Sequence, residues 1–550
     1  MSKKLMALLL ACMMIVSLVA CGNSESGAGN GTDAGKTTAA TENGSGTDKG
    51  QTVGTEDGQT AETGNDNATQ AGDGQDVGSG AVDWEDMAEL EVYYFTFVAP
   101  NSIKGVEDGI NAITEDAINT HVTLHVLDIG SYIQQVGLMM SGGEQMDLML
   151  TGFDSASFSS MMAQNQLMDI SYYIDDYGPN IKNILGDLLK AGTIGDGVYC
   201  TPNYRNMVSS VYVFMREDVL EDLGLAEKAR NMTSWSEYEE IMKAVTESEK
   251  WNYLKPLAVT NGAGLLEAGA NLSGSFGESD VFDQLGDTLS MIHLDDSGKV
   301  SLNMESDSYK AAAALTADWY AKGYVYSDVS SDSSCSDLVK DNVVFSYITS
   351  GEFGAEESHT ASDGYDMMAV EVCKTDLTSE ACTKFAWCVP NTAVYPEAAV
   401  AFLNLAYTSP EINNLMAWGV EGVDYEVVDG VAQYIAGNET PEYHLFDYSV
   451  PNQFLVWPWG TSAADERERS EADLKAAPVS EYLGFSFDTS AITNSITALS
   501  NVKAEYHMQI ISGAGGQEAL DAYIQKLYNV GAQEYIDAYQ TQLDAWLAEK

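Results

Sequence analysis

His121 and His125 have the spacing of a metal-binding pair, because they lie four residues apart. That spacing brings two side chains together only on a helix. Segment 121–128 has the apolar and β-branched residues of a strand, where the two histidines would lie about 13 Å apart at about 3.3 Å per residue. Zinc needs ligands within about 2 Å of one ion. We therefore expect no metal site and no cofactor.

Motifs of nucleophilic or metal-assisted catalysis are absent from the chain. It contains no HExxH, no Gly-x-Ser-x-Gly and no CxxC. A glycosidase needs a pair of carboxylates, and the chain has 83 acidic residues, so their number alone does not exclude this class of enzyme. Acids this abundant are mostly solvated surface, so we expect no catalytic residue and no enzyme.

Seven cysteines occur in the chain, two of them within the first 21 residues. The other five are loosely spaced and odd in number, which does not fit a disulfide framework: Cys200, Cys335, Cys373, Cys382 and Cys388. The three within 373–388 leave one disulfide or a metal site open. We favour buried free thiols, because two of the three lie in apolar strand-like runs.

The N-terminus combines the features of secretion and lipid attachment. Two lysines precede an uncharged apolar run over 5–19, and Ala20 precedes Cys21. Leu18-Val19-Ala20-Cys21 resembles the lipobox of bacterial lipoproteins. The resemblance implies a signal peptide over 1–20 and a lipidated Cys21 whose acyl chains, such as palmitate, anchor the chain at the extracytoplasmic face of the cell membrane. An ordinary secretory signal is the alternative, and a membrane-spanning helix needs about 20 apolar residues, more than this run has.

Residues 21–83 are expected to be the lipidated cysteine followed by a disordered tether. Gly, Ser, Thr, Asn, Asp, Glu, Gln and Ala make up almost all of this stretch, and no aromatic residue occurs in it before Trp84. Such a segment has too little apolar area to offset the entropy of ordering.

The chain is strongly acidic, with a formal net charge of −57. Residues 84–550 carry −50 of it, because 1–21 is net +2 and 22–83 is net −9. The acidity therefore belongs to the folded part. Such a surface repels nucleic acid and anionic lipid headgroups, so we expect no nucleic-acid partner.

Strands and helices alternate from residue 84 onward. Predicted strands at 89–97, 121–128 and 146–151 are separated by helices at 102–119 and 132–140. This order is typical of a mostly parallel sheet covered on both faces. The C-terminal part is predicted to be helical, over 492–511, 517–529 and 534–548.

The order of motifs resembles the extracellular solute-binding proteins of ABC importers. Gly178-Pro179, Gly197-Val198-Tyr199, Ser234-Trp235-Ser236-Glu237 and Val389-Pro390-Asn391-Thr392 stand in the order of that family. The segment from Trp418 to Tyr425 looks like the Gly-x-Glu-Gly-x-x-Tyr stretch of its oligosaccharide-type lipoproteins, and the tail from Gly484 resembles a C-terminal region of unassigned function in one branch of them.

This resemblance implies an α/β, two-lobed periplasmic-binding-protein-like fold of type II, with a hinge between the lobes and a helical C-terminus. Lobe one is expected at 84–203 with 372–418. Lobe two is expected at 204–371 with 419–550, and whether the C-terminal helices form a separate module stays open.

The candidate ligand-binding residues are aromatic and polar side chains suited to sugars. Trp457-Pro458-Trp459-Gly460 is the most conspicuous group, because its proline and glycine indicate a loop. Trp418 and Glu421 lie where the family's matching segment nears the binding cleft. Packing of the lobe is the alternative role for the tryptophans.

Strand ends supply the remaining candidates, because ligands of α/β sheets bind beyond the carboxyl ends of the strands. Tyr94 ends the first strand and Asp154 follows the third, where capping a helix is an equally good role for it. Tyr204 and Arg205 follow the first crossover, and Tyr347 and Ser350 end a later strand.

These observations predict a membrane-anchored protein that captures a small solute, an oligosaccharide by resemblance, and delivers it to an ABC transporter permease. A secreted glycoside hydrolase and a surface adhesion protein without a small ligand are the alternatives. The identities of the ligand and the permease stay open.

Overall fold

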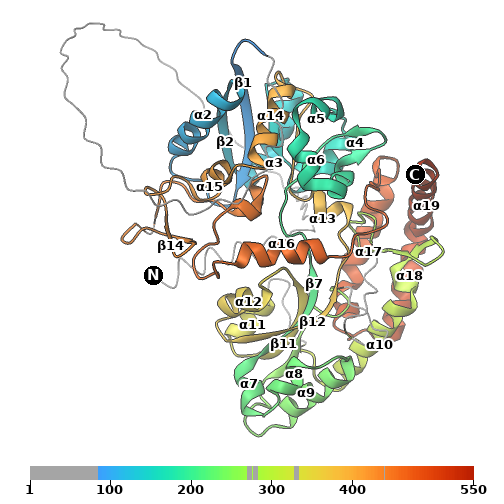
Figure 1. Ribbon diagram of the computed structural model, residues 1–550. Helices are drawn as coiled ribbons and strands as arrows, with labels where there is room; N and C mark the ends of the chain where they lie inside the picture. Colours follow the sequence, from blue (N-terminus) through green and yellow to red (C-terminus); the bar gives the residue numbers. More distant parts are fainter. Residues whose placement is uncertain (1–83, 269–275, 277–282, 327–333, 439) are drawn as a thin grey trace, which may run out of the picture. The chain divides into compact units, whose positions relative to one another are not determined.

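The computed structural model describes residues 84–268, 276, 283–326, 334–438 and 440–550 (Figure 1). The predicted signal peptide, Cys21 and the tether lie outside these residues. In the described part of the chain, every helix is too short or too polar to span a bilayer.

The first sheet has the strand order β2-β1-β3-β13-β6. Strand β1 (Ala88–Thr96) runs parallel to β2 (Thr120–Asp128), with the two strands in register along their whole length, and parallel to β3 (Leu148–Leu150). Strand β13 (Ala386–Cys388) is antiparallel to β3 and to β6 (Thr201–Pro202). The three predicted strands are confirmed. The second half of β1, from Val92 to Thr96, is buried on both faces, whereas Glu89 in its first half is exposed and Glu91 is partly buried.

Helices cover both faces of this sheet. Because β2 and β3 flank β1 on opposite sides, right-handed crossovers place α2 on one face and α3 on the other. Helix α14 packs on β1 and on α2, and its side chains are nearly all buried. The helices here are α2 (Lys104–Ile118), α3 (Ile129–Gly142), α4 (Phe158–Ala163), α5 (Ser171–Tyr177), α6 (Pro179–Leu185), α13 (Ser379–Thr383), α14 (Pro396–Ala406), α15 (Pro410–Trp418) and α16 (Glu466–Ala476).

The second sheet has the order β12-β7-β11-β8. Its strands are β7 (Ser210–Arg216), β8 (Lys255–Ala258), β11 (Val344–Gly351) and β12 (Met367–Lys374), and only β11 and β8 run parallel. Along β7, Val213 and Phe214 belong to different core clusters, as alternating strand side chains do. The helices here are α7 (Glu217–Asp222), α8 (Ala226–Arg230), α9 (Trp235–Glu247), α10 (Asp307–Ala321), α11 (Cys335–Lys340) and α12 (Ala355–Asp363). The chain thus has the two expected α/β lobes.

Three crossing segments connect the parts of the chain that belong to different cores. They comprise residues 203–209 after β6, 375–385 after β12, and 477–484 after α16. The first two segments are joined where the Thr375 amide donates to the Ser209 carbonyl at 2.9 Å. The second and third are joined where the Leu377 amide donates to the Pro478 carbonyl at 2.8 Å. The three segments therefore form one hydrogen-bonded group.

Helix α16 braces these crossing segments with polar side chains. Glu471 accepts a hydrogen bond from the Tyr204 hydroxyl at 2.9 Å. The backbone carbonyl of Ser470 accepts one from the side-chain amide of Asn206 at 3.1 Å. Asp473 forms an ion pair with Lys374 at 2.5 Å. Figure 1 shows α16 as a single helix alongside the segment that enters β7.

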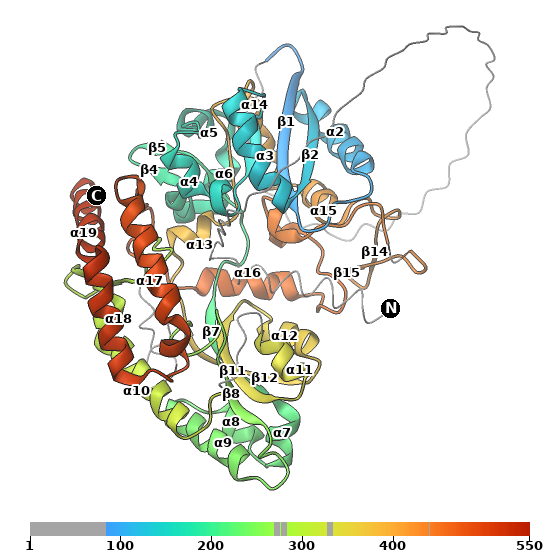
Figure 2. The same ribbon diagram turned by 180° about the vertical axis from the view of Figure 1, so that it is seen from behind.

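The C-terminal helices form one core with a segment of the second lobe. Helices α17 (Thr493–Ile511), α18 (Gly516–Val530) and α19 (Ala532–Glu549) lie side by side in both ribbon views (Figure 2). Their buried face packs on residues 285–304, which contain the hairpin of β9 (Ile292–Leu294) and β10 (Val300–Leu302). The three predicted helices are present, and they fold together with this hairpin.

The largest difference between the expected lobe boundaries and the observed cores lies in the C-terminal part of the chain. We assigned 419–550 to lobe two, but buried residues from Tyr425 to Leu483 belong to the core of the first sheet. The segment returns to the first lobe because Tyr443 packs under β1, where its hydroxyl lies 3.0 Å from that of Tyr94. Only the part beyond about residue 485 joins the second lobe.

The five cysteines of the folded part are all free and buried. Burial raises the pKa of the Cys335 and Cys382 thiols to about 12, which keeps these thiols protonated and unreactive. The arrangement is the one that we favoured over a disulfide. Among the described residues, no three His, Cys, Asp or Glu side chains are grouped as metal ligands would be.

We predict that the Asp287–Tyr535 contact couples the C-terminal helices to the second lobe. The buried Asp287 carboxylate accepts hydrogen bonds from three backbone amides of its own segment and from the Tyr535 hydroxyl on α19. Tyr535→Phe should lower the free energy of unfolding by about 1.5–3 kcal/mol, the usual value of a hydrogen bond to a charged group. Urea unfolding of the full chain measures this change. Tyr172→Phe is the control, because that side chain is 72% exposed, and equal midpoints for the two variants would show that the contact couples nothing.

Candidate functional site

A row of aromatic rings lies at the carboxyl edge of the first sheet. Phe97 directly follows β1, Phe153 is the third residue after β3, and Phe385 directly precedes the antiparallel β13. All three therefore lie at the same edge of the sheet. Phe446 and Tyr448 from a later loop complete this set of five, which we call the aromatic row.

Contacts between neighbouring rings hold the aromatic row together. Ring centroids are 5.1 Å apart for Phe97 and Phe446, 6.1 Å for Phe446 and Tyr448, and 6.2 Å for Tyr448 and Phe385. Buried Phe95 lies behind the row, with its centroid about 6 Å from four of its neighbours. Phe97 and Phe446 stay partly exposed. Flat rings held at a rigid edge provide the surface that the C–H face of a sugar needs.

Charged side chains of both lobes interact with the rings of the aromatic row. The Arg205 guanidinium lies 5.1 Å from the Phe385 ring centroid and 5.9 Å from that of Tyr448. Glu352 follows β11 of the second sheet, and its charge, together with burial, raises the pKa of the Tyr448 hydroxyl well above its usual value. The row therefore lies where side chains of the second sheet come close to the first.

The predicted tryptophans form a separate cluster. The Trp418 and Trp459 rings lie 4.8 Å apart, and both pack on His444. The Trp418 indole donates a hydrogen bond to the Trp457 carbonyl at 3.0 Å. Burial lowers the pKa of His444 to about 4, so this imidazole is neutral at pH 7. The cluster is joined to the hairpin of β14 (Glu426–Val428) and β15 (Val431–Gln433), because the Ala432 amide donates to the Pro458 carbonyl.

The side chains of two of these tryptophans are mostly buried within the lobe, and the third is exposed. Trp418 is 5% exposed and Trp459 is partly buried, whereas Trp457 is 42% exposed. Glu421 is also exposed, in the turn before the hairpin. The prediction thus selected residues that the fold brings together, but most of the tryptophan surface is used within the lobe.

The strand-end candidates lie mostly in the cores. The buried Tyr94 hydroxyl contacts that of Tyr443, and the Tyr204 hydroxyl contacts Glu471. The buried Tyr347 hydroxyl is within 2.6 Å of Asp363 and His359. Ser350 is exposed at the end of β11. Asp154 begins a short 3₁₀ helix (Asp154–Ala156), and its side chain lies outside the described part of the structure.

Sequence reasoning missed the aromatic row by a few residues. The rule that ligands bind beyond the carboxyl ends of strands pointed to the edge at which the aromatic row lies, but it selected Tyr94, inside β1, instead of Phe97 beyond it. The sequence around Phe446 and Tyr448 gives no indication that these residues lie near the sheet edge, because their segment returns to the first lobe from far along the chain. Of the residues predicted at strand ends and crossovers, Arg205 is the one in contact with the row.

The two predicted histidines have structural partners. His125 stacks on Tyr93, with ring centroids 4.1 Å apart, and its Nε2 lies 2.5 Å from Glu91. His121 lies 2.7 Å from Glu115. Both project from β2, as the strand interpretation requires.

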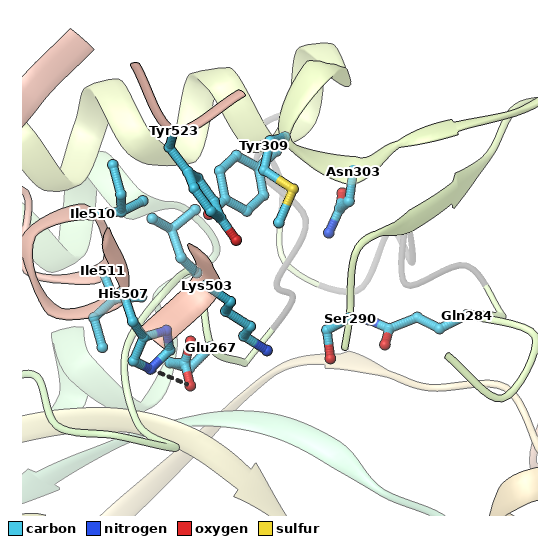
Figure 3. Close-up of a pocket in the computed structure, with 12 residues that line it drawn as sticks. Glu267, Gln284, Ser290, Asn303, Tyr309, Lys503, His507, Ile510, Ile511 and Tyr523 are labelled. Carbon is cyan, nitrogen blue, oxygen red and sulfur yellow. Dashed lines mark ion pairs between the residues drawn. The ribbon is translucent and has the colours of Figure 1, made fainter. Parts of the chain in front are cut away.

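A small cavity lies elsewhere, between the C-terminal helices and the second lobe (Figure 3). Its volume is about 80 Å³, and its polar lining includes Tyr309, Lys503 and His507. Because a water molecule needs at least about 10–15 Å³ of such space, the cavity accommodates a few waters. It is too small for an oligosaccharide.

Comparisons with known proteins agree on one fold. A curated carbohydrate ABC transporter substrate-binding protein of Streptococcus pneumoniae is 21% identical over 446 residues, covering 78% of this chain and 84% of that protein. The crystal structure of an N-glycan transport solute-binding protein of S. pneumoniae matches with a TM-score of 0.69 at 20% identity, covering 84% of this chain and 99% of that one.

Another solved structure has the same coverage at a lower score. It is an HMO-binding, ABC-transporter-associated solute-binding protein of Bifidobacterium longum infantis, with a TM-score of 0.57 and 18% identity. At these identities the likeness concerns the two-lobed fold. A domain of unknown function, DUF3502, matches residues 481–548, which are the C-terminal helices and the segment that leads into them. The profile of the bacterial extracellular solute-binding proteins matches residues 110–430, more than half of the chain, and the chain therefore belongs to that family.

Proposed function

We propose that this protein is a membrane-anchored receptor that captures an oligosaccharide and delivers it to an ABC transporter permease. The aromatic row at the edge of the first sheet carries this proposal, because its partly exposed rings suit the C–H faces of sugars. The family supports a binding role, and the named relatives take carbohydrates or glycans. No catalytic step belongs to this function.

The ligand is proposed to contact both lobes. Phe97 and Phe446 provide the sugar-stacking surface on the first lobe, and Glu352 of the second lobe accepts hydrogen bonds from sugar hydroxyls. Trp457 and the exposed Glu421 and Ser350 extend the set of candidate contacts. Binding to both lobes favours the closed arrangement over the open one, since a ligand shifts a conformational equilibrium by its difference in affinity for the two states. The hydrogen-bonded crossing segments are the natural hinge for that motion.

We predict that Phe97→Ala weakens binding of oligosaccharides. Removal of a stacked ring should raise the Kd about tenfold or more, because an aromatic contact contributes roughly 1 kcal/mol beyond its buried area. Intrinsic fluorescence of the full chain, titrated with neutral oligosaccharides such as maltotriose, cellotriose and Man5GlcNAc, measures the affinity. Trp457→Ala is the matched variant, because it removes an exposed ring from the tryptophan cluster. A loss of affinity in Trp457→Ala alone would move the site to that cluster, and product formation from any sugar would favour the hydrolase alternative.

We predict that Cys21 holds the protein on the membrane. Cys21→Ala removes the thiol that takes the diacylglyceryl group, and the chain should then appear in the medium instead of the membrane fraction. Immunoblots of fractionated cells follow the distribution. Cys12→Ala is the control, because this cysteine lies within the proposed signal peptide. Full retention of Cys21→Ala on the membrane would refute the lipid anchor.

A further inference from the structure

Two cations at the crossing segments, Arg205 and Lys384, form no ion pair with any residue that the structure describes. Arg205 in the first segment is 3% exposed, and one of its Nη atoms donates to the Asn206 carbonyl at 2.8 Å. Its Nε is buried without an acceptor. Lys384 in the second segment is partly buried, and within the described part of the chain no carboxylate lies within ion-pair distance of either side chain.

Burial and mutual repulsion both act against the charge of this pair. Burial lowers the pKa of the Lys384 ammonium, and the charge of Arg205 lowers it further. Glu352 and Glu380 oppose this effect from a longer distance. A buried charge without a hydrogen-bonded counter-ion destabilises a fold, so these two cations are retained against a cost.

Other cations of the same region are paired. Lys374 forms an ion pair with Asp473 at 2.5 Å, Arg467 with Asp447, and Lys475 with Glu471. The chain has 83 acidic residues for 26 basic ones, so acidic partners are abundant. The absence of a partner at Arg205 and Lys384 is therefore a local property of this site.

The surroundings of the pair identify the kind of group that would complete it. The guanidinium lies against the rings of Phe385 and Tyr448, the end of the aromatic row nearest the crossing segments. A guanidinium presents paired N–H donors that match a carboxylate, and an ammonium adds a second point of charge. A sugar stacked on the row would place its substituents beside both cations.

We propose that Arg205 and Lys384 form a subsite for the carboxylate of an acidic sugar residue within the oligosaccharide. This inference rests on the proposed function and names the substrate class of that site. The strong negative charge of the chain disfavours free small anions, whereas a carboxylate on an oligosaccharide gains the stacking contacts of the row as well. Salt screens the distant surface acids beyond about 8 Å at physiological ionic strength, so the nearby cations dominate at the subsite.

The test uses one pool of glycans in two chemical forms. The full chain is incubated with a pool of oligogalacturonates, sialylated N-glycans and glucuronate-containing fragments, and with the same pool after methyl esterification of its carboxylates. Native mass spectrometry identifies the captured species, and calorimetry with trigalacturonate or the captured glycan gives the Kd. We expect capture of carboxylated species and a loss of about tenfold or more in affinity on esterification, the factor of one charged hydrogen bond.

Variants separate the subsite from a general charge effect. Arg205→Gln and Lys384→Gln should each remove the preference for the acid over the ester, measured in each variant as the ratio of the Kd values for the two forms. Arg230→Gln is the matched control, because it removes an arginine whose ion pairs with Glu217 and Glu356 lie on the second lobe. Arg230→Gln should leave the preference unchanged, and far-ultraviolet circular dichroism checks that each variant is folded.

The outcomes distinguish this inference from the function on which it rests. Equal affinity for acid and ester, or capture of neutral glycans alone, overturns the acidic-sugar subsite and leaves the oligosaccharide receptor in place. An acid preference that survives in both glutamine variants also overturns the assignment to Arg205 and Lys384. Failure to capture any glycan, acidic or neutral, overturns both.

Discussion

The hydrogen bonds between the three crossing segments are the constraint on which the rest of the structure depends. Thr375 joins the second segment to the first, and Leu377 joins it to the third. These hydrogen bonds join backbone groups, so the alignment of the segments does not depend on side-chain contacts. Helix α16 then packs on one side of these segments, where its residues accept hydrogen bonds from Tyr204 and Asn206 and form an ion pair with Lys374. The aromatic row ends at these segments, so their geometry also sets the position of the candidate site.

Charge is distributed unevenly in this acidic chain. Most of the surface carries carboxylates, which keep the protein soluble and repel polyanions at long range. The crossing segments and α16 bring several cations together near the edge of the first sheet, where Arg205 packs on aromatic faces. Glu352 of the second lobe acts on the same row, so the site contains charges of both signs.

The C-terminal helices are an integral part of the second lobe. Their apolar faces cover the hairpin of β9 and β10, and the carboxylate of Asp287 ties the hairpin segment to Tyr535. Neither partner buries its apolar face alone, so the two segments depend on each other although they are about 250 residues apart. The small cavity between them is a packing defect with polar walls.

Local sequence patterns were sufficient to predict the α/β class, the three parallel strands of the first sheet and the C-terminal helices. Periodicity and turn residues are local, and β1, β2 and α2 lie within a few residues of their predicted places. The sequence also pointed to the edge of the sheet at which the aromatic row lies and to Arg205, which contacts that row. Three features became apparent only from the folded chain. Residues 425–483 return to the first lobe, and the side chains of Trp418 and Tyr347 are buried in the cores. Phe446 and Tyr448 complete the aromatic row. These outcomes depend on contacts between residues far apart in the chain, and such contacts leave no pattern in the local sequence.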